Sequence, residues 1–135
     1  MLRNVLYLTV GAVLLAGCVV SVHNREYATD RKSGQVLRHV VLFKFKDDAS
    51  SRQVREIENA FRALPSKVDA ICDFEWGTDV SVENLQQGFT HCFFVTFRSE
   101  ADRAEYIPHP AHKEFGRMLG PHLDKVLVVD YWAKR

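Results

Sequence analysis

Polar and apolar residues alternate along residues 37–45, which is the pattern of a half-buried β-strand. His39, Val41 and Phe43 fall on one face of this strand, and Leu42 falls on the other. Because both faces carry apolar side chains, each of them is expected to meet a covering layer.

The next segment changes to a spacing of three and four residues, through Val54, Ile57 and Phe61. This period predicts an amphipathic helix, since residues at that spacing share one side of a helix. Asp47, Asp48 and Ser50 all offer N-caps for it, and Pro65 marks its end.

Three further strands are predicted, over residues 68–80 (with a bulge at Gly77), 89–97 and 126–132. Two short helices separate the last two strands. Ser99 caps the first, which Pro108 ends, and Pro110 fits the first turn of the second, with His109 as its N-cap and Gly120-Pro121 as its stop. The order βαββααβ predicts a ferredoxin-like α+β sheet with its helices on one side.

A second apolar sheet face remains after the helices have been assigned to the first. Its members are Val40, Leu42, Phe94, Leu127, Val129 and Tyr131. A face this apolar is not expected to stay in water, and two-fold symmetric pairs are the commonest oligomers. The sequence therefore predicts a homodimer in which two sheets pack face to face.

The N-terminal segment reads as a secretion signal. Arg3 precedes an uncharged run, and residues 15–18 read Leu-Ala-Gly-Cys, which resembles the lipobox of bacterial lipoproteins. On this reading residues 1–17 form the signal peptide, Cys18 carries the lipid, residues 18–35 form a flexible linker, and residues 36–135 form the domain.

An uncleaved membrane anchor is the alternative, because about 18 apolar residues can just span a bilayer. Both readings place the domain outside the cytoplasm, tethered to a membrane and facing the periplasm or the cell exterior. Val19 follows the cysteine where an aspartate would retain a Gram-negative lipoprotein at the inner membrane, so the outer membrane is favoured. The net charge of +1, with both signs interspersed, gives no indication of a nucleic-acid partner.

Residues 106–112 read Tyr-Ile-Pro-His-Pro-Ala-His and concentrate the candidate chemistry. His112 falls in the first turn of the predicted helix, on the same side as Phe115 and Leu119, so it is expected to point inward. With Tyr106 nearby, it could form a general acid/base pair. The alternative is a buried histidine that is hydrogen-bonded for structural reasons.

Five segments of the chain, in this order, resemble the stress-response dimeric A/B barrel family: residues 37–46, 73–77, 89–91, 106–112 and 130–131. The resemblance spans about residues 36 to 132 and implies a ferredoxin-like fold that pairs into a dimeric α/β barrel. The family includes a plant polyketide cyclase that closes a ring by aldol condensation without metal or cofactor.

The match to that cyclase implies that Tyr106 and His112 are a catalytic pair. It also implies a pocket between sheet and helices, lined by His39, Val41, Phe43, Phe61, Phe93, Phe115 and Leu123. Leu123 takes the place of a tryptophan and Phe93 that of a valine, so the substrate is expected to differ from that of the cyclase.

Two classes of function follow. The first is a dimeric binding module that holds a small apolar or aromatic molecule, or only scaffolds an assembly at the membrane. The second is a cofactor-free lyase or cyclase that uses Tyr106 and His112. A metal held by His39, His91, His109 and His112 is a third, less favoured reading, because no carboxylate or thiol is placed at a matching spacing and His109 is better explained as an N-cap. We expect neither a metal nor a cofactor.

Overall fold

The structure is a computed structural model that describes residues 35–134. It contains the predicted order of elements, with two short 3-10 turns added. The elements are β1 (Leu37–Phe45), α1 (Ser51–Arg62), η1 (Leu64–Ser66), β2 (Asp73–Thr78), β3 (His91–Phe97), α2 (Glu100–Tyr106), α3 (Pro110–Leu119), η2 (Gly120–His122) and β4 (Leu123–Trp132). The predictions for residues 1–34 lie outside the described residues.

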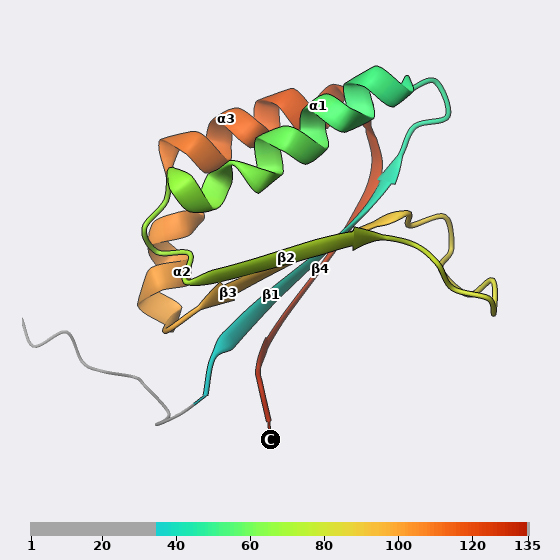
Figure 1. Ribbon diagram of the computed structural model, residues 1–135. Helices are drawn as coiled ribbons and strands as arrows, with labels where there is room; N and C mark the ends of the chain where they lie inside the picture. Colours follow the sequence, from blue (N-terminus) through green and yellow to red (C-terminus); the bar gives the residue numbers. More distant parts are fainter. Residues whose placement is uncertain (1–34, 135) are drawn as a thin grey trace, which may run out of the picture.

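The four strands form one antiparallel sheet in the order β2-β3-β1-β4. The helices lie on one side of this sheet, with α1 and α3 side by side above it (Figure 1). This arrangement confirms the ferredoxin-like α+β fold. Within residues 35–134, no helix is long and apolar enough to cross a membrane.

The second strand is shorter than predicted, since β2 covers only Asp73–Thr78. The apolar residues before it, Val68 and Ile71, are buried in a turn that follows η1, so their hydrophobicity reflects core packing and not strand pairing. The bulge expected at Gly77 is wrong, because Gly77 pairs in regular register with Cys92.

The helix caps form where the sequence predicted them. Ser50 and Gln53 make a reciprocal capping box at the start of α1. Ser99 accepts a hydrogen bond from the backbone N–H of Asp102 at the start of α2. His109 caps α3 through its Nδ1, which accepts from the backbone N–H of Ala111 at 3.2 Å. These bonds satisfy donors that each helix leaves unpaired at its first turn.

A cluster of aromatic rings fills the space between the helices and the sheet. Phe61 from α1 stacks on Phe93 of β3, with ring centroids 4.3 Å apart, and lies 4.7 Å from Phe115 of α3. Phe43 of β1 contacts all three of these rings. Removing one fully buried phenylalanine side chain typically costs about 3 to 5 kcal/mol, so this cluster holds α1 and α3 in place over the sheet.

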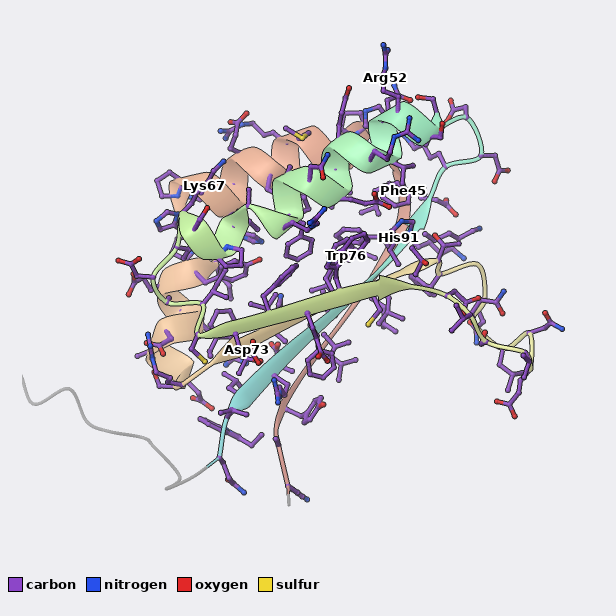
Figure 2. All side chains as sticks on the ribbon, in the orientation of Figure 1. Phe45, Arg52, Lys67, Asp73, Trp76 and His91 are labelled. Carbon is purple, nitrogen blue, oxygen red and sulfur yellow. The ribbon has the colours of Figure 1, made fainter. Side chains whose placement is uncertain are left out.

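His91 ties α1 to the sheet through its imidazole. Its Nε2–H donates to the Glu58 carboxylate at 2.9 Å, and its Nδ1 accepts from the Thr90 hydroxyl at 2.8 Å. The His91 and Trp76 side chains lie between the sheet and the helices, whereas Arg52 of α1 points away into solvent (Figure 2). Both ring nitrogens of His91 are thus occupied by structural partners.

No helix among residues 35–134 covers the other sheet face. Leu127, Val129 and Tyr131 of β4 are each more than two-fifths exposed on that face. The edge strand β4 is also poorly covered on its helix side, where Val126 is 50% exposed. The predicted imbalance between the two sheet faces is therefore present in the structure.

Candidate functional site

A cavity of about 180 Å³ opens between α3 and the β1–β4 side of the sheet. Its lining residues are His39, Val41, Phe43, Phe61, Tyr106, His112, Phe115, Gly116, Leu119, Val126 and Val128. A cavity of about 150 Å³ with apolar walls takes up benzene, so this one has room for a substituted ring or an aliphatic molecule of similar size.

His112 lies in the first turn of α3, which His109 and Pro110 start. Its Nδ1–H donates to the backbone carbonyl of Ile107 at 2.9 Å, across the turn that joins α2 to α3. This bond fixes the tautomer, because the nitrogen that donates carries the proton. The Nε2 atom of His112 is therefore left with a lone pair.

Tyr106 closes α2 and is 1% exposed. Its ring centroid lies 4.3 Å from that of His112 and 5.8 Å from that of His39, so the three rings form one group at the end of the cavity. Burial raises the pKa of the Tyr106 phenol well above its ordinary value. The hydroxyl therefore stays protonated and able to donate a hydrogen bond.

His39 is held by a hydrogen-bonded row of side chains that runs on to Asp130 and Arg103 and that the sequence did not reveal. Its Nδ1 lies 2.6 Å from Oδ1 of Asp130, and the other carboxylate oxygen of Asp130 lies 3.0 Å from Nη1 of Arg103. Asp130 sits directly opposite His39 in the β1–β4 pairing. The register of these two strands was the signal that could have found it, because paired residues project to the same face.

Two of the predicted pocket residues do not line this cavity. Phe93 is fully buried and lies between the rings of Phe61 and Trp76, to which its centroid distances are 4.3 and 5.6 Å. Leu123 pairs with Phe45 at the start of β4 and packs against the edge of the core. Phe93 supports the wall of the cavity from behind, because it contacts the lining residues Phe43 and Phe61. The other predicted residues, His39, Val41, Phe43, Phe61 and Phe115, surround it together with Tyr106 and His112.

The histidines separate into two locations. His39 and His112 reach the cavity, whereas His91 is bound to Glu58 and Thr90 at the other end of the sheet. Among residues 35–134, no group of three or more histidine, cysteine, aspartate or glutamate side chains is arranged to hold a metal ion.

The cavity combines apolar walls with a small set of polar groups at one end. A free imidazole nitrogen can accept a proton, and a protonated phenol can donate a hydrogen bond to a carbonyl or hydroxyl oxygen. Apolar walls around few polar groups are typical of sites for small organic molecules. The geometry therefore suits a small apolar molecule that carries one oxygen function.

Comparison with known proteins identifies the family. A family model described as the stress responsive A/B barrel domain matches residues 37–133, which is nearly all of the described domain. The chain belongs to this family. The match includes the strands, the helices and the segment that carries Tyr106 and His112.

Two plant relatives cover most of the domain. The stress-response A/B barrel domain-containing protein HS1 of Arabidopsis thaliana is 46% identical over 95 residues, which is 70% of this chain and 87% of the relative. Olivetolic acid cyclase of Cannabis sativa is 34% identical over 99 residues, which is 73% of this chain and 98% of the cyclase.

Solved structures show the same fold. A hydroxynitrile lyase from Passiflora edulis has a TM-score of 0.69 at 30% identity, over 73% of this chain and 94% of the lyase. A dimeric protein with a ferredoxin-like fold from Bacteroides fragilis has a TM-score of 0.59 at 27% identity, over 71% of this chain and 94% of that one. Solved structures similar to this chain thus include a lyase and a dimeric protein.

Proposed function

We propose that this protein is a homodimeric, membrane-anchored binding protein that holds a small apolar or aromatic molecule between α3 and the sheet. The observation that carries the proposal is the cavity of about 180 Å³, whose walls are phenylalanine, valine and leucine side chains. Such walls favour apolar ligands through the area that they remove from water. Tyr106, His112 and His39 then select a ligand with an oxygen at one end.

A second candidate function is a cofactor-free lyase or cyclase. The observation that favours it is the hydrogen bond from His112 to Ile107, which leaves the Nε2 atom of His112 free to act as a base. In this mechanism Nε2 takes a proton from the substrate while the Tyr106 hydroxyl donates to the oxygen on which negative charge develops. The similarity to olivetolic acid cyclase and to a hydroxynitrile lyase supports this chemistry.

The homodimer is supported by the uncovered sheet face. Packing that face against a second copy removes Leu127, Val129 and Tyr131 from water, and it covers the partly exposed Val40 and Leu42 beside them. Exposed apolar surface of this extent is typical of protein interfaces. The dimeric protein from Bacteroides fragilis shares the fold that carries this face.

The membrane anchor is supported by the sequence alone. The Leu-Ala-Gly-Cys segment at residues 15–18 follows an apolar run of the length that signal peptides use. Cleavage before Cys18 and lipidation of its thiol would attach the domain to a membrane through residues 18–35, outside the cytoplasm. The ligand would then be a molecule of the cell envelope or the surroundings.

The ligand site can be tested by filling the cavity. A Cβ atom at Gly116, which lines the cavity, would meet no atom within 4 Å, so Gly116→Leu is expected to occupy the space without a clash. The variant should weaken the binding of acetophenone, a small aromatic ketone, by tenfold or more in calorimetry. Its melting temperature should not fall, because leucine favours helix over glycine by about 1 kcal/mol.

Gly120→Leu is the matched control, since a Cβ there also meets no atom within 4 Å but the residue does not line the cavity. It should bind acetophenone like the unmodified protein. Unchanged affinity in Gly116→Leu would place the ligand elsewhere.

The lyase can be tested with mandelonitrile, whose cleavage releases benzaldehyde. His112→Ala should lower the rate by about 10² to 10⁴, the usual contribution of a general base. It should lower the free energy of unfolding by only about 1 kcal/mol, since it removes one exposed hydrogen bond. His122→Ala is the control, because His122 does not line the cavity. Equal turnover by His112→Ala and the unmodified protein would remove the lyase from consideration and leave ligand binding standing.

The dimer can be tested with a charge on the uncovered face. Leu42→Glu or Val129→Glu should give a folded monomer in light scattering, because an unpaired charge buried between two sheets costs several kcal/mol. Lys113→Glu, on the exposed side of α3, should leave the dimer intact. A well-folded monomer for the unmodified protein would contradict the proposal.

The anchor can be tested by the intact mass of protein extracted from membranes. The expected mass corresponds to a chain that begins at Cys18 and carries acyl groups. Cys18→Ala should prevent both cleavage and lipidation. A protein that retains residues 1–17, or that is recovered without a lipid, would show that the segment is not a lipoprotein signal.

A further inference from the structure

We propose that residues 79–90, here called the arm, reach across the dimer and pack on the first half of β4 of the partner subunit. In that position the arm completes the wall of the partner's cavity next to Val126. This inference rests on the homodimer proposed above and adds to it that each ligand site is built from two subunits.

The arm carries three large apolar side chains that the other residues of 35–134 leave exposed. Val80 and Val82 are each 89% exposed, and Leu85 is 72% exposed. The arm projects past the end of the sheet, on the side away from the helices (Figure 1). Three such side chains within six residues indicate a surface that is covered in the assembled protein.

Backbone hydrogen bonds fix the base of the arm, where Val80 leaves β2. The N–H of Asp79 donates to the carbonyl of Thr90 at 2.9 Å, and the N–H of Thr90 donates to the carbonyl of Phe43 at 2.9 Å. The N–H of Phe89 donates to the carbonyl of Gln86 at 2.9 Å and closes a turn on the return to β3. The arm thus continues the β2–β3 hairpin.

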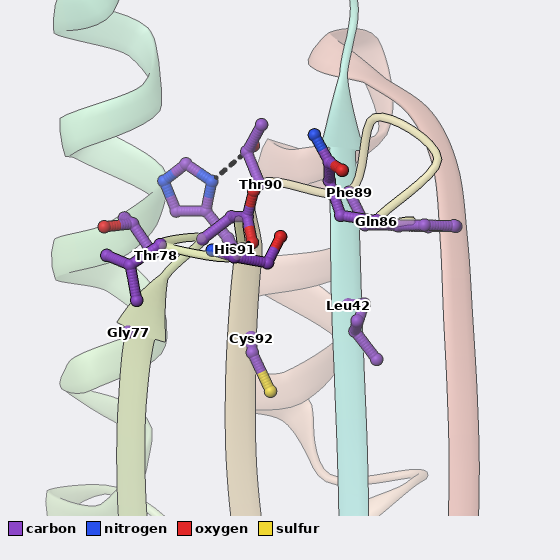
Figure 3. A pocket seen from close by; sticks show the side chains of 11 residues that line it. Leu42, Gly77, Thr78, Gln86, Phe89, Thr90, His91 and Cys92 are labelled. Carbon is purple, nitrogen blue, oxygen red and sulfur yellow. Dashed lines mark hydrogen bonds between the residues drawn. The ribbon is translucent and has the colours of Figure 1, made fainter. Parts of the chain in front are cut away.

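A hollow of about 390 Å³ lies between the arm and the outer face of the sheet. Leu42 and Cys92 of the sheet and Gln86 and Phe89 of the arm line it (Figure 3). The Oε1 atom of Gln86 is buried there and has no hydrogen-bond partner among the described residues. Buried polar atoms are nearly always paired, so a donor from water or from a partner subunit is expected at this point.

The first half of β4 offers the matching surface. Val126 and Leu127 are 50% and 45% exposed on opposite faces of this edge strand, and Val126 lines the ligand cavity. The outer edge of β4 has no strand beside it within the sheet. Natural proteins usually cover such an edge, because its unpaired backbone groups recruit other chains.

The strand order shows how the arm reaches this surface. Thr78 pairs with His91, His91 with Phe43, and Phe43 with Val126. These four residues form one row across the sheet, so the arm leaves β2 at the same height along the strands as Val126. When two sheets pack face to face about a two-fold axis parallel to the strands, β2 of one sheet lies opposite β4 of the other. This rotation does not change the height of any residue along the strands. The arm then meets the first half of the partner's β4.

The other two-fold arrangement, with the axis across the strands, sets β2 opposite β2. The arm would then meet the exposed carboxylates of Asp73 and Glu75 of the partner subunit. Apolar side chains gain little by burial against such groups. The apolar arm therefore fits the apolar β4 better than the acidic β2, which favours the two-fold axis parallel to the strands.

The test uses two preparations of the protein extracted from membranes in detergent, each with Cys72 and Cys92 replaced by serine and each carrying one new cysteine. Lipidation removes the free thiol of Cys18, and the parent protein without a new cysteine shows whether any linkage occurs there. Val80→Cys is mixed with Leu127→Cys, the subunits are exchanged, and a short bismaleimide is added. A tag on one preparation distinguishes mixed from self-linked dimers. We expect mixed dimers in high yield, because the two thiols lie close together only across the interface.

Tyr131→Cys is the matched control, since Tyr131 lies on the same face of β4 at 43% exposure but about 13 Å further along the strand. It should link to Val80→Cys at least tenfold more slowly than Leu127→Cys does. Preferential linkage of Val80→Cys to Tyr131→Cys, to Glu75→Cys or to itself, in a protein that light scattering shows to be dimeric, would overturn the arm's position and leave the dimer standing. A monomer would overturn both.

Closure of the cavity is tested separately by the alkylation of Val126→Cys, made in the same background without Cys72 and Cys92. Replacing Val80, Val82 and Leu85 by serine should speed this alkylation by about tenfold at a protein concentration where the dimer persists. Each of these side chains is more than 70% exposed in the protomer, so its loss should not affect folding. An unchanged rate would show that the arm does not cover the partner's cavity.

Discussion

The packing of four phenylalanine rings between the helices and the sheet determines where the helices lie, and with them the cavity. Phe61 and Phe115 bring α1 and α3 onto the same face, where Phe43 and Phe93 of the two central strands receive them. Because α3 is fixed at this distance, its first turn holds His112 against Tyr106 and leaves a cavity toward β4. The candidate chemistry thus depends on a hydrophobic contact that takes no part in it.

The same packing uses all of the helices on one face and leaves the other uncovered. The uncovered face, the free edge of β4 and the apolar arm are three apolar surfaces that remain exposed among residues 35–134. In the proposed dimer a second copy covers the face, and the strand order brings the arm to the edge of the partner's sheet. Assembly and ligand binding are coupled in that dimer, because one wall of the cavity faces the partner.

The sequence predicted the parts of the fold that local patterns determine. Alternation gave β1 its observed ends, and the caps at Ser50, Ser99 and His109 depend on residues within one helical turn. The second strand was placed too early because a buried turn and a strand can both be apolar. The link between His39 and Asp130 depends on the register of strands 91 residues apart, which no local pattern contains. Phe93 faces the helix side as expected but is covered by other rings, which alternation cannot show.

In the proposed site, the Nε2 atom of His112 faces a ligand between α3 and the sheet, because Nδ1–H is bound to Ile107. Long-range ¹H–¹⁵N NMR of the histidine side chains measures the tautomer of each imidazole and its response to acetophenone. We expect the Nδ1–H tautomer for His112. Addition of acetophenone should change the imidazole chemical shifts of His112 and His39 but not those of His91. A proton on Nε2 of neutral His112, or a response confined to His91, would contradict the proposed site.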